Sequence, residues 1–190
     1  AFSHSAEAYT CKAANVMMEP LALSSMEMIV KHLPAAMKAP GDLDELEQLL
    51  IASCMAGQAF TQVGLHLGHA IAHGVGVYGH VHHGTACALV LPYALSSVSE
   101  AIPDRIAKVG EILGAKIPAQ ATPREIGLIV SDALQSFNRS IGIKRLSDYG
   151  VTEEQLDSMA EYAVHEGGTQ GNSFRPSPKA EVVDYLRSIL

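Results

Sequence analysis

Apolar residues recur along most of the chain at the spacing of one face of an α-helix. Asp42 is a candidate helix cap. The helix predicted after it has an apolar stripe at Leu46, Leu49, Leu50 and Cys54, and the small Ser53 lies on the same face. Thr122 and Thr152 are each followed three residues later by Glu or Gln, the capping-box signature of a helix start. A last helix is predicted after Ser177–Pro178, with apolar positions at Val182, Val183, Leu186 and Ile189.

Further helices are predicted between these starts, at Ala6–Met18, Leu21–Leu33, His83–Ser97 and Pro103–Leu113. Strand signals are almost absent. The valine-rich segment Gly74–Val81 is interrupted by glycines, so we interpret it as a glycine-rich turn between two helices. Its G-x-G-x-x-G spacing follows a helix and not a strand, which argues against a dinucleotide-binding loop. We therefore expect an all-α helical domain over residues 1–190.

The start of the chain is unusual. Residues 1–10 already have a helical character, and no clear cap or loop precedes them. Because a natural domain rarely begins inside a helix, we expect Ala1 to be a cut within a longer protein. The chain also lacks the alternation of strands and helices that a dinucleotide-binding domain requires, so such a unit would have to lie outside it.

Composition and charge exclude several classes of protein. Of the 190 residues, 48% are hydrophobic and 17% charged, which is typical of a globular protein. The net charge of −7, without a Lys/Arg cluster, argues against a nucleic-acid or anionic-membrane surface. The most apolar stretch, Ala86–Leu95, is about half the length of a membrane span and contains Pro92.

The three cysteines, Cys11, Cys54 and Cys87, are widely spaced and form no C-x-x-C motif. This pattern argues against a disulfide framework or a thiolate zinc site and suits a reducing cytoplasm. Each cysteine lies in an apolar helical context, so we expect three buried structural thiols.

Histidines are strongly concentrated in one short segment. Six of the nine lie between residues 66 and 83, at His66, His69, His73, His80, His82 and His83. His69 and His73 are four residues apart, which places both imidazoles on one face of a helix. Paired histidines on a half-buried helix are one interpretation. A zinc protease is a weaker one, because Ala70 stands where the glutamate base of H-E-x-x-H would be.

A second histidine cluster, His82–His83–Gly84, follows the predicted turn and opens an apolar helix. A helix, a tight turn and a returning helix would bring His83 back beside His69. Neutral imidazoles from two antiparallel helices suit Zn²⁺ or Fe²⁺ better than Ca²⁺ or Mg²⁺. The spacing predicts a transition-metal site but does not say which histidines bind.

Several segments resemble the signature of iron-containing alcohol dehydrogenases, G-L-x-x-x-H-A-x-A-H-x-[LV]-G, followed by P-H-G and L-P. The matching segments are Gly64–His73, His83–Gly84 and Leu91–Pro92–Tyr93. Ala1–Tyr9 resembles the family's D-A-x-x-H-x-x-E-A-Y element without its aspartate, and Asn172–Pro176 more loosely resembles N-P-R-P. The matches follow one another in the family's order over nearly the whole chain.

The resemblance implies a fold, a site and an activity. The fold would be the helical bundle of the dehydroquinate synthase-like and iron-containing alcohol dehydrogenase type, without the N-terminal nucleotide-binding half. The metal ligands would be His4, His69 and His83, together with an aspartate directly before Ala1 that this chain does not contain. His73 would lie near the metal and the nicotinamide, where it positions substrate or relays a proton.

The implied reaction interconverts an alcohol and an aldehyde or ketone by metal-assisted hydride transfer. Its cofactors would be a divalent metal, Fe²⁺ in the family with Zn²⁺ as an alternative, and NAD or NADP in the full-length enzyme. The chain would then be the metal-binding half of a cytoplasmic oxidoreductase, inactive on its own and dependent on a nucleotide-binding half. The resemblance is compatible with a homo-oligomer but does not fix the oligomeric state.

Two residues depart from the family pattern. His82 replaces the proline before the third ligand, and we expect an exposed neighbour of the site in preference to an extra ligand. His66 either lines the cleft or faces solvent. We expect surface or cap positions for His32, His80 and His165.

Two functions of other classes remain as alternatives. One is a non-catalytic helical metal-binding or interaction domain, in which the histidines are structural. The other is a histidine–metal hydrolase built on His69 and His73, which would have to work without the glutamate base.

Overall fold

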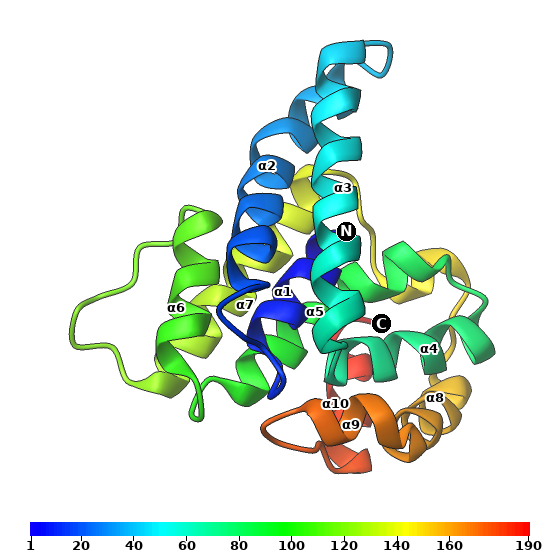
Figure 1. Cartoon of the computed structure of the whole chain (residues 1–190). Coiled ribbons are helices and arrows are strands. Elements are labelled where there is room, and N and C mark those ends of the chain that lie inside the picture. The colour runs from blue at the N-terminus through cyan, green and yellow to red at the C-terminus, as the bar shows by residue number, and fades with distance from the viewer.

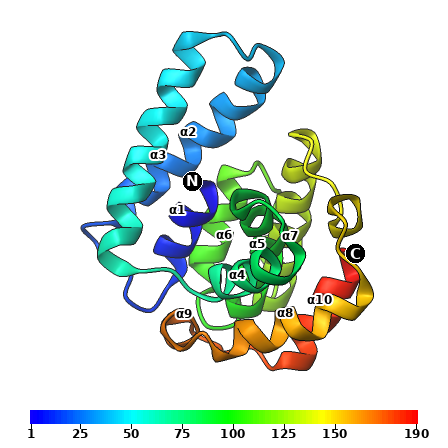
Figure 2. The same ribbon diagram turned by 90° about the vertical axis from the view of Figure 1, so that its right-hand side faces the viewer.

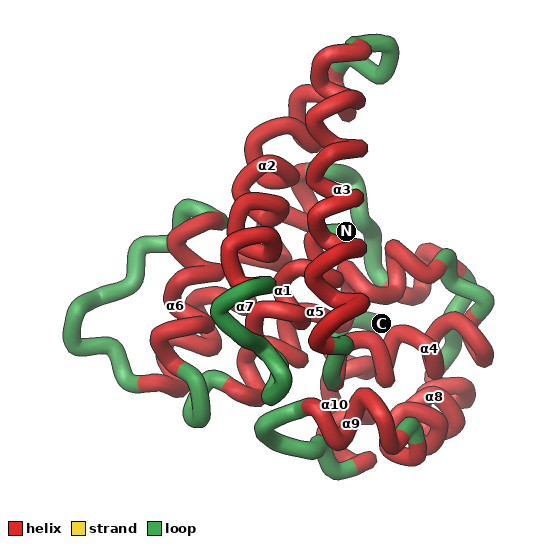
Figure 3. The backbone as a smooth tube through the Cα atoms, viewed as in Figure 1, coloured by secondary structure: helices red, strands yellow, loops and turns green.

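The computed structural model describes residues 1–190 and contains helices and connecting loops only (Figure 3), which confirms the all-α prediction. None of the helices combines the length and hydropathy needed to cross a membrane. Ten α-helices and one short 3₁₀ helix follow one another along the chain: α1 Phe2–Thr10, α2 Glu19–Lys38, α3 Leu43–Val63, α4 Leu67–Gly79, α5 His83–Val98, α6 Pro103–Ile112, α7 Pro123–Ser140, η1 Leu146–Tyr149, α8 Glu153–His165, α9 Gly167–Asn172 and α10 Lys179–Ser188.

Helix α5 lies at the centre of the molecule and contributes to both hydrophobic cores. Its Leu91 and Leu95 pack with α1, α2, α3, α6 and α7, whereas Val90 and Ala94 pack with α4, α8 and α10. All four side chains are at most 1% exposed. Burying a leucine of this kind contributes about 1.5–3 kcal/mol. Helices α2 and α3 form a long antiparallel pair that projects from this body (Figures 1 and 2).

The predicted capping residues do cap helices. The Asp42 carboxylate accepts hydrogen bonds from the backbone N–H groups of Asp44 and Glu45 at the start of α3. Thr122 forms a reciprocal capping box with Glu125 at the start of α7, and a second capping box, based on Thr152, opens α8. These contacts satisfy N–H groups that a helix leaves unpaired at its first turn.

The predicted helix Ala6–Met18 is wrong at its C-terminal end, since α1 already ends at Thr10. The Asn15 side chain accepts hydrogen bonds from the N–H groups of Met17 and Met18, a local bond that competes with helix formation. The preceding loop is held by the C-terminal region, because the N–H of Lys12 donates to the carbonyl of Asn172. The next helix, predicted at Leu21–Leu33, continues through Pro34 to Lys38.

The interpretation of Gly74–Val81 as a turn is also wrong, because α4 remains helical as far as Gly79. A Cβ atom at Gly74 would overlap the backbone carbonyl of Met159 in α8. The glycine therefore permits close packing of two helices, and the turn itself is limited to residues 80–82. His80, in the left-handed conformation with φ 52°, ends α4.

Helix α3 buries a different face from the one that its apolar stripe predicted. Leu50 is 72% exposed and Cys54 is exposed, which corrects the prediction of three buried thiols. The buried face consists of small residues, Ala52, Ala56 and Ala59, together with Val63. Small side chains allow α2 to approach α3 closely, so close packing of the two helices selects this face over the leucines.

Replacing Gly74 by alanine should lower the free energy of unfolding by about 1–3 kcal/mol, because the added methyl group overpacks the contact between α4 and α8. Gly57→Ala is the matched control, since nothing lies within 4 Å of its added Cβ. We expect the control to gain roughly 0.5–1 kcal/mol from helix propensity. Urea unfolding followed by circular dichroism measures both changes, and equal stability of the two variants would contradict the close-packing account.

Candidate metal centre

Three histidines from three helices converge on one point. His4 of α1, His69 of α4 and His83 of α5 each offer a ring nitrogen, and these nitrogens lie within 4.8 Å of one another. The ring centroids of His4 and His69 are 4.8 Å apart, and those of His69 and His83 are 5.5 Å apart. The structure thus brings together the three histidines that the family resemblance implies as metal ligands.

His4 is held in place by aromatic stacking. Its ring lies parallel to that of Phe60 in α3, with centroids 4.3 Å apart, and it also stacks on His69. Burial and the neighbouring His69 lower the pKa of His4 to about 4. Burial, followed by the charges of His69 and His73, also lowers the pKa of His83. Both imidazoles are therefore neutral at pH 7, the form that binds a metal.

His69 is oriented by a buried carboxylate. Glu7 of α1 is 1% exposed, and its Oε2 accepts from Nδ1 of His69 at 3.1 Å and from the backbone N–H of His66 at 2.8 Å. Burial raises the pKa of Glu7, but the charges of His66 and His69 and their hydrogen bonds to the carboxylate lower it by more. The pKa of Glu7 is therefore below its ordinary value. Because Nδ1 donates to the carboxylate, Nε2 of His69 remains to face His4 and His83.

The same carboxylate favours a positive charge on His69. Burial opposes protonation, but the hydrogen bonds to Cys87 and Glu7 outweigh it and raise the pKa of His69. A cation at Nε2, whether a proton or a metal ion, is stabilised in the same way. A metal ion must therefore displace a proton here to bind.

His66 neither lines a cleft nor faces solvent, so both alternatives for this residue are wrong. It is 0% exposed, and its Nε2 lies 2.9 Å from the hydroxyl oxygen of Thr10. That hydroxyl donates to the carbonyl of Ala6, so Nε2 of His66 is the donor to Thr10. His66 is the buried N-cap residue of α4, and its backbone N–H donates one of the hydrogen bonds that the Glu7 carboxylate accepts.

His73 lies at the open side of the cluster and pairs with a second carboxylate. Its ring stacks on that of His83, with centroids 5.5 Å apart. Its Nδ1 lies 2.7 Å from Oε1 of Glu166, a residue that the sequence did not single out. A cavity of about 530 Å³ opens beside this pair, and its lining includes His73, His83, Tyr162 and Glu166.

Two further residues beside the cluster had no site role in the sequence interpretation: Glu7, and Cys87, which was expected to be a structural thiol. Cys87 lies one turn after His83 on α5, and its Sγ is 3.6 Å from Nε2 of His69 and 3.5 Å from Nε2 of His83. The thiol is 5% exposed. The i, i+4 spacing from His83 is visible in the sequence and would have indicated this proximity.

The remaining histidines lie outside the cluster. His82 precedes α5 and is exposed, as predicted. His80 and His165 are exposed at helix ends, in agreement with the prediction of cap or surface positions. His32 is half-buried and its Nδ1 lies 2.7 Å from a carboxylate oxygen of Glu45.

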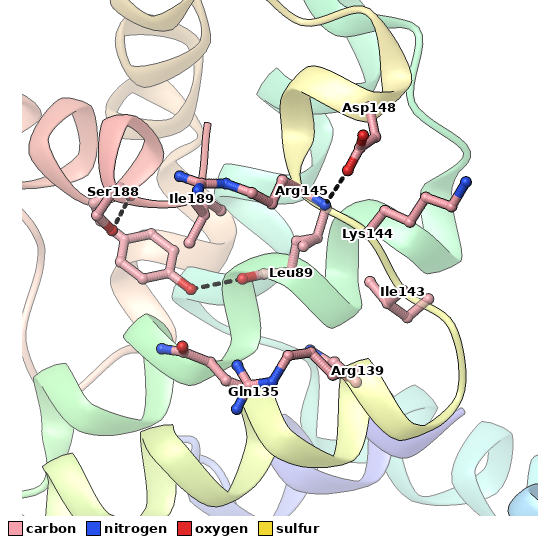
Figure 4. Close-up of a pocket in the computed structure, with 11 residues that line it drawn as sticks. Leu89, Gln135, Arg139, Ile143, Lys144, Arg145, Asp148, Ser188 and Ile189 are labelled. Carbon is pink, nitrogen blue, oxygen red and sulfur yellow. Dashed lines mark hydrogen bonds between the residues drawn. The ribbon is translucent and has the colours of Figure 1, made fainter.

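A second pocket, with a volume of about 420 Å³, lies between α5, α7, η1 and α10 (Figure 4). Arg139, Lys144 and Arg145 contribute to its lining, and the Tyr185 hydroxyl donates to the carbonyl of Leu89 within it. No histidine lines this pocket. It therefore takes no part in the histidine cluster.

The donor set fits a divalent transition metal. It consists of imidazole nitrogens with one nearby thiol, and the orienting carboxylate Glu7 is already engaged with His69. Nitrogen and sulfur donors favour Zn²⁺ or Fe²⁺ over Ca²⁺ and Mg²⁺, which prefer oxygen. A histidine whose second nitrogen donates to a buried carboxylate is a common arrangement in metal sites.

Comparison with known proteins agrees with the family resemblance. The family model described as Fe-containing alcohol dehydrogenase family, C-terminal, matches residues 1–190. The chain is 33% identical over 184 residues to the probable alcohol dehydrogenase EutG of Salmonella typhimurium, covering 97% of this chain and 45% of that protein. It is 31% identical over 191 residues to the NAD-dependent methanol dehydrogenase of Bacillus methanolicus, covering 100% of this chain and 49% of that protein.

Solved structures show the same fold. A 1,3-propanediol oxidoreductase superposes with a TM-score of 0.88 at 28% identity, and it covers 100% of this chain and 49% of the other. The chain spans about half the length of the relatives that it matches. It belongs to the iron-containing alcohol dehydrogenase family and corresponds to the C-terminal helical part of that family.

Proposed function

We propose that this chain is the metal-binding half of an NAD(P)-dependent alcohol dehydrogenase that interconverts an alcohol and an aldehyde or ketone. The observation that carries the proposal is the convergence of His4, His69 and His83, from three helices, in a chain of this family. Relatives at about 30% identity carry the names of alcohol dehydrogenases, including a NAD-dependent one. The metal is Fe²⁺ or Zn²⁺, and the three histidines hold it.

A divalent metal bound by these histidines supplies a Lewis acid that polarises the substrate hydroxyl. The residues of the chain prepare the site for it. Glu7 fixes the ring of His69, and Phe60 fixes the ring of His4 by stacking. Their positions are set by folding, so little reorganisation is needed when substrate binds.

His73 and Glu166 transfer the proton of the reaction. Oxidation of an alcohol to a carbonyl compound moves a hydride to the nicotinamide and releases one proton. The His73 imidazole borders the cavity beside the cluster, and its side chain is itself 37% exposed, so it can pass a proton to solvent directly. His73 accepts the proton and Glu166 stabilises the resulting imidazolium, as in other histidine–carboxylate pairs. The same cavity would receive the nicotinamide, with His73 beside it.

The nucleotide is held mainly by residues that this chain does not contain. Its residues form no strand, and hence no βαβ unit with a phosphate-binding loop. We therefore infer that the isolated chain binds metal but does not turn over alcohols. Activity requires a nucleotide-binding half facing the open side of the cavity.

Titration of the metal-free chain with Zn²⁺ in a calorimeter should show one high-affinity site. His69→Ala should weaken binding by at least about 100-fold, because it removes both a ligand and the partner of Glu7. His80→Ala and His165→Ala are matched controls, since both histidines are exposed and lie outside the cluster. If His69→Ala binds Zn²⁺ as tightly as these controls, the histidine cluster is not the metal site.

Glu7→Gln should reduce zinc affinity by about 10- to 100-fold, the range seen for outer partners of metal-binding histidines. The amide keeps the shape of the side chain but removes the charge that favours a cation on His69. Glu166→Gln is the control, because it changes a carboxylate that contacts His73 and no member of the three-histidine cluster. Circular dichroism verifies folding of both variants. Equal affinities for the two would refute the role of Glu7 in orienting His69.

In the protein that joins this chain to a nucleotide-binding half, His73→Ala should lower kcat by about 10²- to 10⁴-fold, the range for lost acid–base catalysis. Its metal content should be unchanged, since His73 is not one of the three convergent histidines. Steady-state assays with NAD(P)⁺ and metal analysis give both values. A kcat close to that of the unmodified protein would show that His73 does not relay the proton.

A further inference from the structure

The pocket between α5, α7, η1 and α10 contains charge that the histidine site does not use (Figure 4). Its lining includes three cationic side chains, Arg139, Lys144 and Arg145, and a single carboxylate, Asp148. Oδ2 of Asp148 already accepts from the backbone N–H of Arg145 at 3.1 Å. Although the chain has a net charge of −7, this lining has an excess of positive charge, so the pocket attracts anions.

Two of these cations are arginines without a carboxylate partner. The chain contains six arginines, and half of them pair with glutamates, namely Arg105, Arg175 and Arg187. Arg139 and Arg145 form no such pair, and the guanidinium group of Arg139 donates to the neutral hydroxyl of Ser136. The charges of both arginines are therefore available to a ligand.

Figure 4 shows how the cationic side chains of this pocket lie. Arg139, on α7, and Arg145, directly before η1, extend in the same direction along opposite sides of the pocket, whereas Lys144 extends the other way. Arg139 and Arg145 are also exposed, so both side chains are free to turn toward a ligand that they share. The two arginines are the principal anion-binding groups here.

The number of oxygens on the anion determines which class of anion fits. A guanidinium group binds a carboxylate or a phosphate through two parallel N–H donors. One arginine therefore occupies both oxygens of a carboxylate, whereas the three terminal oxygens of a phosphate monoester can accept from two arginines at once. A phosphate monoester also carries a charge of about −1.5 to −2 at pH 7, more than a carboxylate does. Two arginines thus favour the phosphate.

The rest of the lining suits an organic group attached to that phosphate. Leu89, Ile143 and Ile189 contribute apolar side chains, and the hydroxyl of Tyr185 donates to the carbonyl of Leu89 at 2.6 Å. The volume of about 420 Å³ lies within the range of roughly 300–1,000 Å³ that is typical of small-molecule sites. An inorganic phosphate ion would leave most of this apolar lining uncovered.

We propose that this pocket binds a phosphate monoester of a small apolar alcohol. Arg139 and Arg145 hold the phosphate from opposite sides, and the organic group packs against Leu89 and Ile143. The site is distinct from the histidine cluster, because no histidine lines it. The inference is therefore independent of the proposed dehydrogenase activity.

Calorimetric titration of the metal-free chain with phenyl phosphate tests the proposal, because this probe joins a phosphate group to an apolar ring. We expect saturable binding at one site, with weaker binding of inorganic phosphate. Benzoate, which has the same ring with a carboxylate, should bind at least about 10-fold more weakly, because it engages one arginine fully and not two. Arg139→Gln and Arg145→Gln should each weaken phenyl phosphate binding by at least about 10-fold, the effect of losing charge-assisted hydrogen bonds.

Two controls separate this pocket from the rest of the molecule. Arg124→Gln should bind phenyl phosphate like the unmodified chain, since Arg124 is exposed, has no carboxylate partner and lies outside the pocket. His69→Ala should also leave the affinity unchanged. Circular dichroism verifies that each variant is folded.

The outcomes distinguish this inference from the proposed function. No saturable binding by the unmodified chain, or equal affinities of the Arg139, Arg145 and Arg124 variants, would overturn the site. Loss of binding in His69→Ala alone would place the probe at the histidine cluster and would also overturn it. Benzoate that binds as tightly as phenyl phosphate would overturn the assignment to a phosphate monoester. None of these results bears on whether the three histidines bind a metal.

Discussion

One buried carboxylate determines the geometry of the candidate site. Oε2 of Glu7 accepts from the backbone N–H groups of His66 and His69 and from Nδ1 of His69. A charge buried to this extent costs several kcal/mol unless it is paired, and the N-terminus of α4 supplies the pairing dipole and donors. These hydrogen bonds join α1 to α4 and thereby fix the position of His4, on α1, relative to His69, on α4. Gly68 lets the carboxylate approach this closely, because a Cβ atom at that position would overlap Oε1 of Glu7.

Much of the fold follows from local sequence signals. Capping residues such as Asp42 and Thr122 predict helix starts correctly, since their hydrogen bonds involve neighbours only three residues away. The errors arise where tertiary contacts dominate. Gly74 is a turn signal by composition, but in the structure it lies in a helix against the backbone of Met159. The buried face of α3 is chosen by close packing on α2 and not by the hydrophobicity of its leucines.

For the candidate site too, the sequence identified the residues of the motif but not the contacts that form only on folding. The resemblance to a family with a long motif identified His4, His69, His83 and His73, and the first three do converge. Glu166 gave no local signal, because 93 residues separate it from its partner His73. His66 was misjudged because nothing in its sequence neighbourhood shows that Glu7 and Thr10 enclose it. Such contacts exist only after the helices have packed.

The central claim is that helices α1, α4 and α5 hold one metal ion between His4, His69 and His83. Anomalous X-ray diffraction at the zinc edge, from crystals of the chain soaked in Zn²⁺, tests it most directly. The account predicts one dominant anomalous peak at about 2.0–2.1 Å from Nε2 of His69 and from one ring nitrogen each of His4 and His83. A dominant peak that contacts none of the three histidines, or no peak at the cluster in zinc-saturated crystals, would contradict the account.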